Sequence, residues 1–145
     1  SGNDSNAGTS DAPFLTIQAA IDAAVADGSI TEIHVAQGTY QSSATVTLAP
    51  AISIYGGYRT NYWSTRNSTT YPSIITDART AGGADLAPLA AVTLDVAGDD
   101  LVFDGFTVNA GSGTYSTAFY TDTSYHYTVS NCILNGGSGS TRSSG

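Results

Sequence analysis

The sequence predicts an all-β solenoid, in which a parallel β-helix carries a capping α-helix at its N-terminal end. Three observations support this fold class. Short apolar strands recur between Gly, Asp, Asn and Pro turn signals. Only one stretch, near the start, has strong helical periodicity. A segment near the C-terminus repeats an earlier one, and repeats with a period of roughly 20 to 50 residues indicate a solenoid.

The predicted helix spans residues 13–27. Pro13 suits the first turn of a helix, and Gly28 suits the left-handed position just after its end. Apolar residues at i, i+3, i+4 and i+7 spacing give the helix one apolar face, formed by Phe14, Ile17, Ile21, Ala24 and Val25. A helix of this kind can cover the unpaired strand edges of the first coil. Residues 1–28 are therefore expected to be a loop followed by a cap.

Residues 29–135 are expected to form the coils of one domain, and 136–145 a flexible tail or the start of another coil. Alternating apolar residues place strands around Ile33, Val46, Ile54 and Val92. The segment F-T-V-N-A-G-S-G recurs as C-I-L-N-G-G-S-G, so that Asn135 follows Asn109 by 26 positions. A weaker copy, I-I-T-D-A, spans 74–78. In this alignment, Cys132 takes the inward position of Phe106 in the previous coil.

The composition excludes two classes of partner. The chain has 145 residues, a net charge of −8 and no lysine, and 41% of its residues are hydrophobic. Such an acidic protein has no electrostatic attraction for nucleic acid or anionic lipid. No stretch reaches the roughly 18 apolar residues of a membrane span, so we expect no membrane insertion. Many Ser, Thr, Gly, Asn and Tyr residues are typical of secreted β-rich proteins.

Several motifs together resemble one family. The loop G-N-D-S-N-A-G-T precedes P-F-L-T-I-Q-A-A-I, and V-A-Q-G-T-Y, I-S-I-Y-G-G-Y and F-D-G-F-T-V follow over nearly the whole chain. This arrangement resembles the N-terminal cap and first coils of secreted right-handed parallel β-helix proteins of the pectin-lyase-like superfamily. The resemblance implies a right-handed coil and a secreted or cell-surface location. The superfamily includes lyases, glycoside hydrolases, adhesins and structural proteins, so the fold does not choose among functions.

The sequence assigns no catalytic residue. The opening loop fails the calcium-loop pattern, because Gly8, Thr9 and Leu15 occupy three of its ligand or turn positions. An acidic cluster follows later in the chain and comprises Asp95, Asp99, Asp100 and Asp104. The G-H-G and R-I-K segments of polygalacturonase-like enzymes are missing. A lyase would use lysine or arginine as its base, but the chain has no lysine, and no acid lies within several residues of Arg59 or Arg66. A polar turn explains the acidic cluster better. No cofactor is predicted, and calcium at Asp99 and Asp100 is the alternative.

A second candidate site is aromatic. Tyr58, Arg59, Tyr62, Trp63 and Arg66 lie close together in a turn-rich segment. Exposed aromatic rings beside arginine can stack on sugars or bind a partner protein. The alternative is that these large rings pack the segment against the solenoid wall, as large aromatic residues usually do.

These observations predict a bacterial, secreted or cell-surface protein with a structural or adhesive role and no catalysis in this chain. Two alternatives stay open: the N-terminal fragment of a polysaccharide-active enzyme (a lyase or glycoside hydrolase), and a carbohydrate-binding module. The expected partners are surface glycans, or other copies of the chain through an open C-terminal solenoid end. Such an end would support self-assembly into an oligomer or filament.

Overall fold

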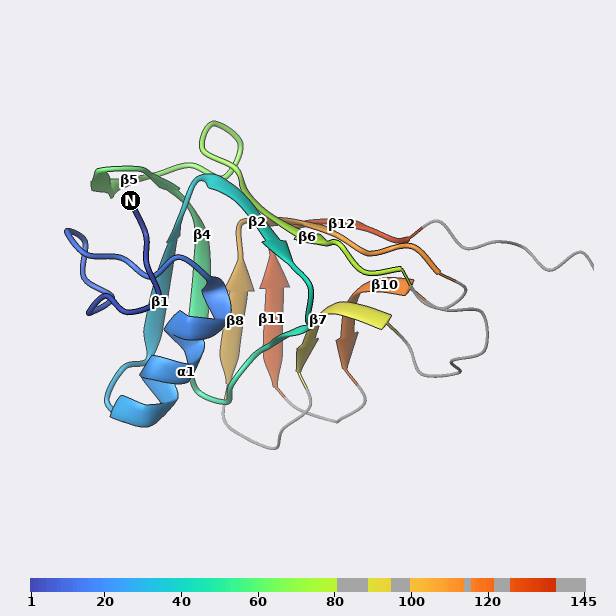
Figure 1. Cartoon of the computed structure of the whole chain (residues 1–145), viewed down its shortest axis with the longest axis horizontal. Helices are drawn as coiled ribbons and strands as arrows, with labels where there is room; N and C mark the ends of the chain where they lie inside the picture. Colours follow the sequence, from blue (N-terminus) through green and yellow to red (C-terminus); the bar gives the residue numbers. More distant parts are fainter. Residues whose placement is uncertain (81–88, 95–99, 114–115, 122–125, 138–145) are drawn as a thin grey trace, which may run out of the picture.

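The computed structural model describes residues 1–80, 89–94, 100–113, 116–121 and 126–137 (Figure 1). They form one helix, α1 (Ile17–Asp27), and a series of short strands. The strands are β1 (Glu32–Ala36), β2 (Gly38–Ser42), β3 (Val46–Thr47), β4 (Ser53–Arg59), β5 (Tyr62–Arg66), β6 (Ser73–Asp77), β7 (Leu89–Leu94), β8 (Leu101–Asp104), β9 (Phe106–Asn109), β10 (Ser116–Thr121), β11 (Tyr127–Ser130) and β12 (Ile133–Asn135).

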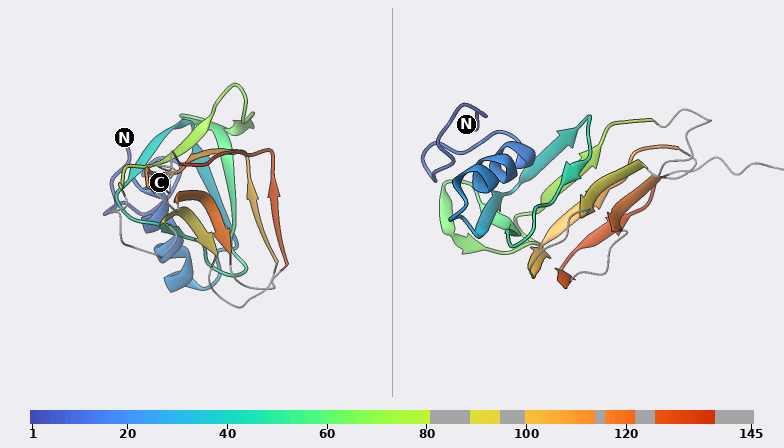
Figure 2. Two further views of the ribbon diagram at one scale, coloured as in Figure 1. Left: turned by 90° about the vertical axis from the view of Figure 1, so that its right-hand side faces the viewer. Right: turned by 90° about the horizontal axis from the view of Figure 1, so that it is seen from below.

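The strands form three sheets, named here in the order in which the chain enters them. The first sheet has the order β1-β4-β8-β11, the second β12-β9-β6-β2, and the third β10-β7-β3. All pairings along these paths are parallel, and β5 is the one strand in the described ranges that pairs antiparallel, with β4. The chain enters the first, second and third sheets in the same order each time, and strands from different parts of the sequence lie side by side in Figure 2. The predicted all-β class with parallel strands is therefore confirmed.

The predicted C-terminal repeat is confirmed by the strand register. Asn135 lies opposite Asn109, and Tyr127 lies opposite Leu101, so equivalent residues in neighbouring coils are 26 positions apart. The amide of Asn135 donates to Oδ1 of Asn109 at 2.8 Å, and the amide of Asn109 donates to Oγ1 of Thr76 at 3.2 Å. Polar side chains therefore stack in a row across the outer face of the second sheet.

The weaker copy at 74–78 aligns one residue differently from the sequence comparison. Thr76, and not Asp77, lies opposite Asn109. Asp77 faces inward and is 5% exposed, because its carboxylate pairs with Arg79 Nη2 at 2.7 Å. The Arg79 guanidinium also donates to the Ala90 carbonyl at 2.7 Å. This pair therefore holds the turn after β6 and serves the fold.

Apolar side chains from all three sheets meet in one core. Phe103 and Phe106 stack at its centre, with ring centroids 4.4 Å apart. Cys132 packs against this core from the last coil, and its Sγ lies 3.5 Å from the Phe106 amide nitrogen. Burial raises the pKa of the Cys132 thiol, although the nearby Phe106 and Gly105 amides oppose this effect. The predicted inward position of Cys132 is therefore correct.

The helix begins at Ile17, four residues later than the sequence predicted. Asp4 Oδ1 accepts the amides of Leu15 and Thr16, each at 2.8 Å, so these amides bond to the loop. Thr16 is the N-cap, and its hydroxyl accepts the Ala19 amide. Gly28 ends the helix with a φ of 72°, as predicted.

The predicted apolar face of this helix was too wide. Ile17, Ile21 and Ala24 are buried, whereas Val25 is 58% exposed. Phe14 lies before the helix, and its ring packs so closely on Gly8 that a β-carbon at Gly8 would collide with it. Phe14 therefore stabilises the opening loop and does not belong to the helix.

The helix lies beside the first strands of the solenoid-like stack, where it contacts β1 and β3. Gln18 reaches from the helix to the edge of the third sheet, and its Oε1 accepts the Thr47 amide at 2.9 Å. This bond satisfies one of the backbone donors that an edge strand leaves free. Within the described residues, the helix is too short and too polar to traverse a lipid bilayer.

Candidate functional site

The candidate site is the β4–β5 hairpin, which the sequence marked by its aromatic residues and arginines. β4 runs out of the first sheet and turns at Asn61, whose φ of 65° suits the left-handed position of a tight turn. β5 then returns antiparallel, with Arg66 opposite Tyr58 and Tyr62 opposite Arg59. The hairpin therefore gathers all five predicted residues.

The tip of the hairpin is accessible to solvent. Tyr62 is 57% exposed, and Arg59 is also exposed. The Arg59 guanidinium carbon lies 4.3 Å from the centroid of the Tyr62 ring, which is a cation–π distance. These two side chains form a small amphipathic platform at the surface.

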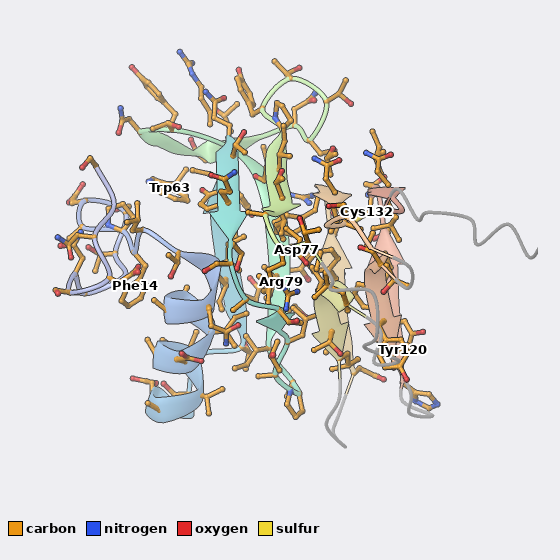
Figure 3. The ribbon with its side chains drawn as sticks, turned by 45° about the vertical axis from the view of Figure 1, so that its right-hand side comes forward. Phe14, Trp63, Asp77, Arg79, Tyr120 and Cys132 are labelled. Atoms are coloured by element: carbon orange, nitrogen blue, oxygen red, sulfur yellow. The ribbon has the colours of Figure 1, made fainter. Side chains whose placement is uncertain are left out.

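Trp63 occupies a different position and is half-buried. Its indole nitrogen donates to the Ser10 carbonyl at 3.2 Å, so it connects the hairpin to the N-terminal loop. Its ring lies 6.2 Å from that of Tyr58. Figure 3 shows Trp63 on the same side of the molecule as Phe14 of that loop. Trp63 therefore contributes to packing as well as to the candidate surface.

Arg66 is held by the fold. It forms an ion pair with Asp104, which is 4% exposed, and its Nε donates to the Gly56 carbonyl at 2.9 Å. Asp104 also accepts the Ser130 hydroxyl and the Asn131 amide, both at 2.6 Å. Burial raises the pKa of the Asp104 carboxyl, but the hydrogen bonds from Ser130, Arg66 and Asn131 together lower it below its usual value. Arg66 therefore braces the base of the hairpin.

Two aromatic partners of the site were missed by the sequence analysis. His34 stacks on Tyr58 at a centroid distance of 4.3 Å, and Tyr55 meets His34 edge-on at 6.3 Å. The Arg66 guanidinium lies 5.5 Å from the Tyr55 ring. His34 lies opposite Tyr55 in the parallel pairing of β1 and β4. Only knowledge of this register would have placed His34 in the cluster.

Burial raises the pKa of the Tyr58 hydroxyl, and the charge on Arg66 opposes that effect only in part. Tyr58 is therefore a neutral hydrogen-bonding phenol across the physiological pH range. A neutral phenol beside histidine and arginine can bind a ligand by stacking and hydrogen bonding.

The calcium alternative falls partly outside the described residues, because Asp99 is among those that the structure does not describe. Asp100 is exposed, with its Oδ1 3.5 Å from Nδ1 of His126. In the described part of the chain, no three His, Cys, Asp or Glu side chains converge as a metal site would require. Calcium at this turn stays a prediction.

The part of the chain that the structure describes defines the class of the protein: an all-β protein with sheets of parallel strands and an N-terminal helix. A family model matches residues 1–139, and its description is "Protein of unknown function (DUF1565)". The chain belongs to this family, which is associated with β-helix proteins. No curated protein and no solved structure matches it significantly.

Proposed function

We propose that the chain forms the capped N-terminal coils of a right-handed parallel β-helix with the pectin-lyase-like architecture. Three features support this proposal: the recurrent order in which the chain enters the sheets, the 26-residue register between the last coils, and the helix beside β1 and β3. The sequence resemblance supports the right-handed coil. A crystal structure with a left-handed or open arrangement would disprove it.

We further propose that the protein is secreted or displayed on the cell surface, where it has a structural or adhesive role. The β4–β5 hairpin supports this proposal, because it presents Tyr62 and Arg59 at the surface. Arg66 fixes its base through Asp104, and Trp63 connects it to the N-terminal loop. A loop held rigidly in this way loses little conformational entropy on binding. The exposed ring and guanidinium favour sugars, so a carbohydrate-binding role is the second candidate.

Replacing Arg59 and Tyr62 together by alanine should weaken adhesion while leaving the fold intact. We expect at least a tenfold loss of binding to surface polysaccharide, since a ring and a stacked cation together contribute roughly 1.4 kcal/mol or more. A glycan array and a pull-down on bacterial cell-wall material would measure this loss. Tyr120→Ala is the matched control, because Tyr120 lies on β10, away from the hairpin (Figure 3).

Equal binding by the double variant and the wild type would contradict the role of the hairpin. Release of reducing or unsaturated sugars from acidic polysaccharides by the wild type would favour the enzyme alternative instead. If no glycan or cell-wall material binds, the role is structural and the adhesive one fails.

The end of the molecule formed by β10, β11 and β12 supports a role in self-association. Leu134 faces inward at this end, opposite Val108, yet is 45% exposed, and Tyr127 is 37% exposed. The hydroxyls of Thr117 and Thr121 are buried there without a hydrogen-bond partner among the described residues. Such an end is stabilised when further strands cover it. We propose that, when the chain is isolated, a second copy of it packs against this end.

Leu134→Asp should therefore shift the isolated chain from dimer to monomer. A carboxylate in the buried contact would be desolvated without a partner, which costs several kcal/mol. Light scattering across a concentration series measures the change. The matched control is Ile133→Asp, since Ile133 is 61% exposed and faces outward from the same strand. A wild type that remains strictly monomeric at high concentration would disprove self-association.

A further inference from the structure

A cleft of about 840 Å³ lies between the N-terminal segment and strand β2. Its volume is within the roughly 300 to 1,000 Å³ typical of ligand sites. The opening loop and the first turns of α1 form one wall, and β1 and β2 form the other, with the turn of the β4–β5 hairpin at the rim. Phe14 and Trp63 also line the cleft, and Figure 3 shows them on neighbouring segments.

β2 is the edge strand of the second sheet, and its position leaves backbone groups free. The Gly38 amide donates to the Pro72 carbonyl at 3.0 Å, and the Ser42 carbonyl accepts the Ala78 amide at 2.9 Å. Peptide groups alternate in direction along a strand, so those of Thr39 and Gln41 point away from β6. They face the cleft.

The N-terminal segment does not satisfy these groups. Gln18 bonds the Thr47 amide at the edge of the third sheet, and α1 contacts β1 at the edge of the first. Among the described residues, no backbone hydrogen bond joins the N-terminal segment to Thr39 or Gln41. β2 therefore presents an open edge of the kind to which an extended peptide adds as a further strand.

The charges of the cleft define the chemistry of the added strand. Asp11 and Glu32 are among the described lining residues, and these residues include no arginine. His34 also lines the cleft, with its Nε2 3.6 Å from Glu32. The aromatic rings of Phe14 and Trp63 can pack against aliphatic stems and against cationic groups. A strand that carries lysine or arginine complements both features.

We propose that this cleft binds an extended, lysine- or arginine-bearing peptide segment of a partner protein, which pairs with the free edge of β2. The peptide groups of Thr39 and Gln41 provide the backbone hydrogen bonds. Asp11, Glu32 and the two aromatic rings select its side chains. The cleft adjoins the hairpin tip, but the Arg59 and Tyr62 side chains do not line it, so peptide binding does not depend on adhesion through those two side chains.

The test uses a capped heptapeptide of alternating threonine and lysine, T-K-T-K-T-K-T. We expect it to shift the backbone amide NMR signals of Thr39 and Gln41 and to change the fluorescence of Trp63, the single tryptophan. Binding should weaken with salt, because the attraction is electrostatic. The glutamate peptide T-E-T-E-T-E-T should bind at least tenfold more weakly. The lysine peptide with every backbone amide N-methylated should also bind at least tenfold more weakly.

Gln41→Pro is the matching change in the protein, with Gln41→Ala as its control. Proline removes the edge donor without removing a bond to β6, because the Gln41 amide faces the cleft. We expect tenfold weaker peptide binding for the proline variant and unchanged binding for alanine. Should the proline variant fail to fold, the N-methylated peptide provides the same test. Equal affinity of the N-methylated peptide, unmoved Thr39 and Gln41 signals, or the same shifts with cellohexaose would overturn the proposal.

Discussion

Deletion of residues 1–27 is expected to convert the protein into a polymer. The deletion removes the loop, α1 and the Gln18 side chain that bonds the Thr47 amide, so the edges of β1 and β3 become free in addition to that of β2. The opposite end already exposes β10, β11 and β12. Each molecule would then carry two different open ends.

The strand register indicates that these two ends fit each other. On the outer face of the second sheet, Thr39 lies opposite Ile74, Ile74 opposite Thr107, and Thr107 opposite Ile133. A second molecule that stacks on β12 would place its own Thr39 beside Ile133 and so continue the alternation. Contacts between unlike ends do not close, and they generate filaments. In the intact chain, α1 prevents this stacking.

Size-exclusion chromatography with light scattering, and thioflavin fluorescence, would follow the polymer. The intact chain should not exceed a dimer, because α1 lies beside β1 and β3 and blocks another molecule from stacking on all three sheets at that end. Combining the deletion with Leu134→Asp at the opposite end should restore solubility. A soluble, monomeric deletion variant would show that α1 is not a protective cap.

Replacing Asp104 by alanine is expected to lower the free energy of unfolding by about 3 kcal/mol, the range for removing one member of a buried ion pair. The change leaves the Arg66 guanidinium without its carboxylate and removes the acceptor of the Ser130 and Asn131 side chains. In a chain of this size, it corresponds to a loss of roughly 10 °C in the melting temperature. Differential scanning calorimetry would measure it.

The matched control is Asp100→Ala, because the Asp100 side chain is 82% exposed. A surface substitution of this kind changes stability by about 0.5 kcal/mol or less. If both variants have the same melting temperature as the wild type, then the Arg66–Asp104 pair does not brace the hairpin.

The pH dependence of Asp104→Asn gives an independent check. The pKa of Asp104 is lower in the folded state than in the unfolded state, so its stabilising contribution is complete above about pH 5. This contribution is lost as the pH falls through the folded pKa. The stability difference between wild type and variant should therefore be constant at neutral pH and shrink below about pH 4. A difference that grows on acidification would contradict the lowered pKa.

The sequence by itself determined the features that depend on local patterns. The alternation around Ile54 and Val92 placed strands, the spacing of Ile17, Ile21 and Ala24 placed the helix, and the repeat between Asn109 and Asn135 predicted the 26-residue register. Each signal lies within a few residues or within two similar segments. Hydrophobic periodicity reports such local order directly.

Only the tertiary structure decided which side chains meet. Arg66 and Asp104 are 38 positions apart, and they pair because the hairpin folds back over the corner after β8. His34 stacks on Tyr58 through the register of β1 with β4, and the free edge of β2 follows from where α1 lies. These contacts depend on how strands of unequal spacing align in parallel sheets. Coil lengths vary with insertions such as the β4–β5 hairpin, so no local pattern in the sequence encodes that alignment.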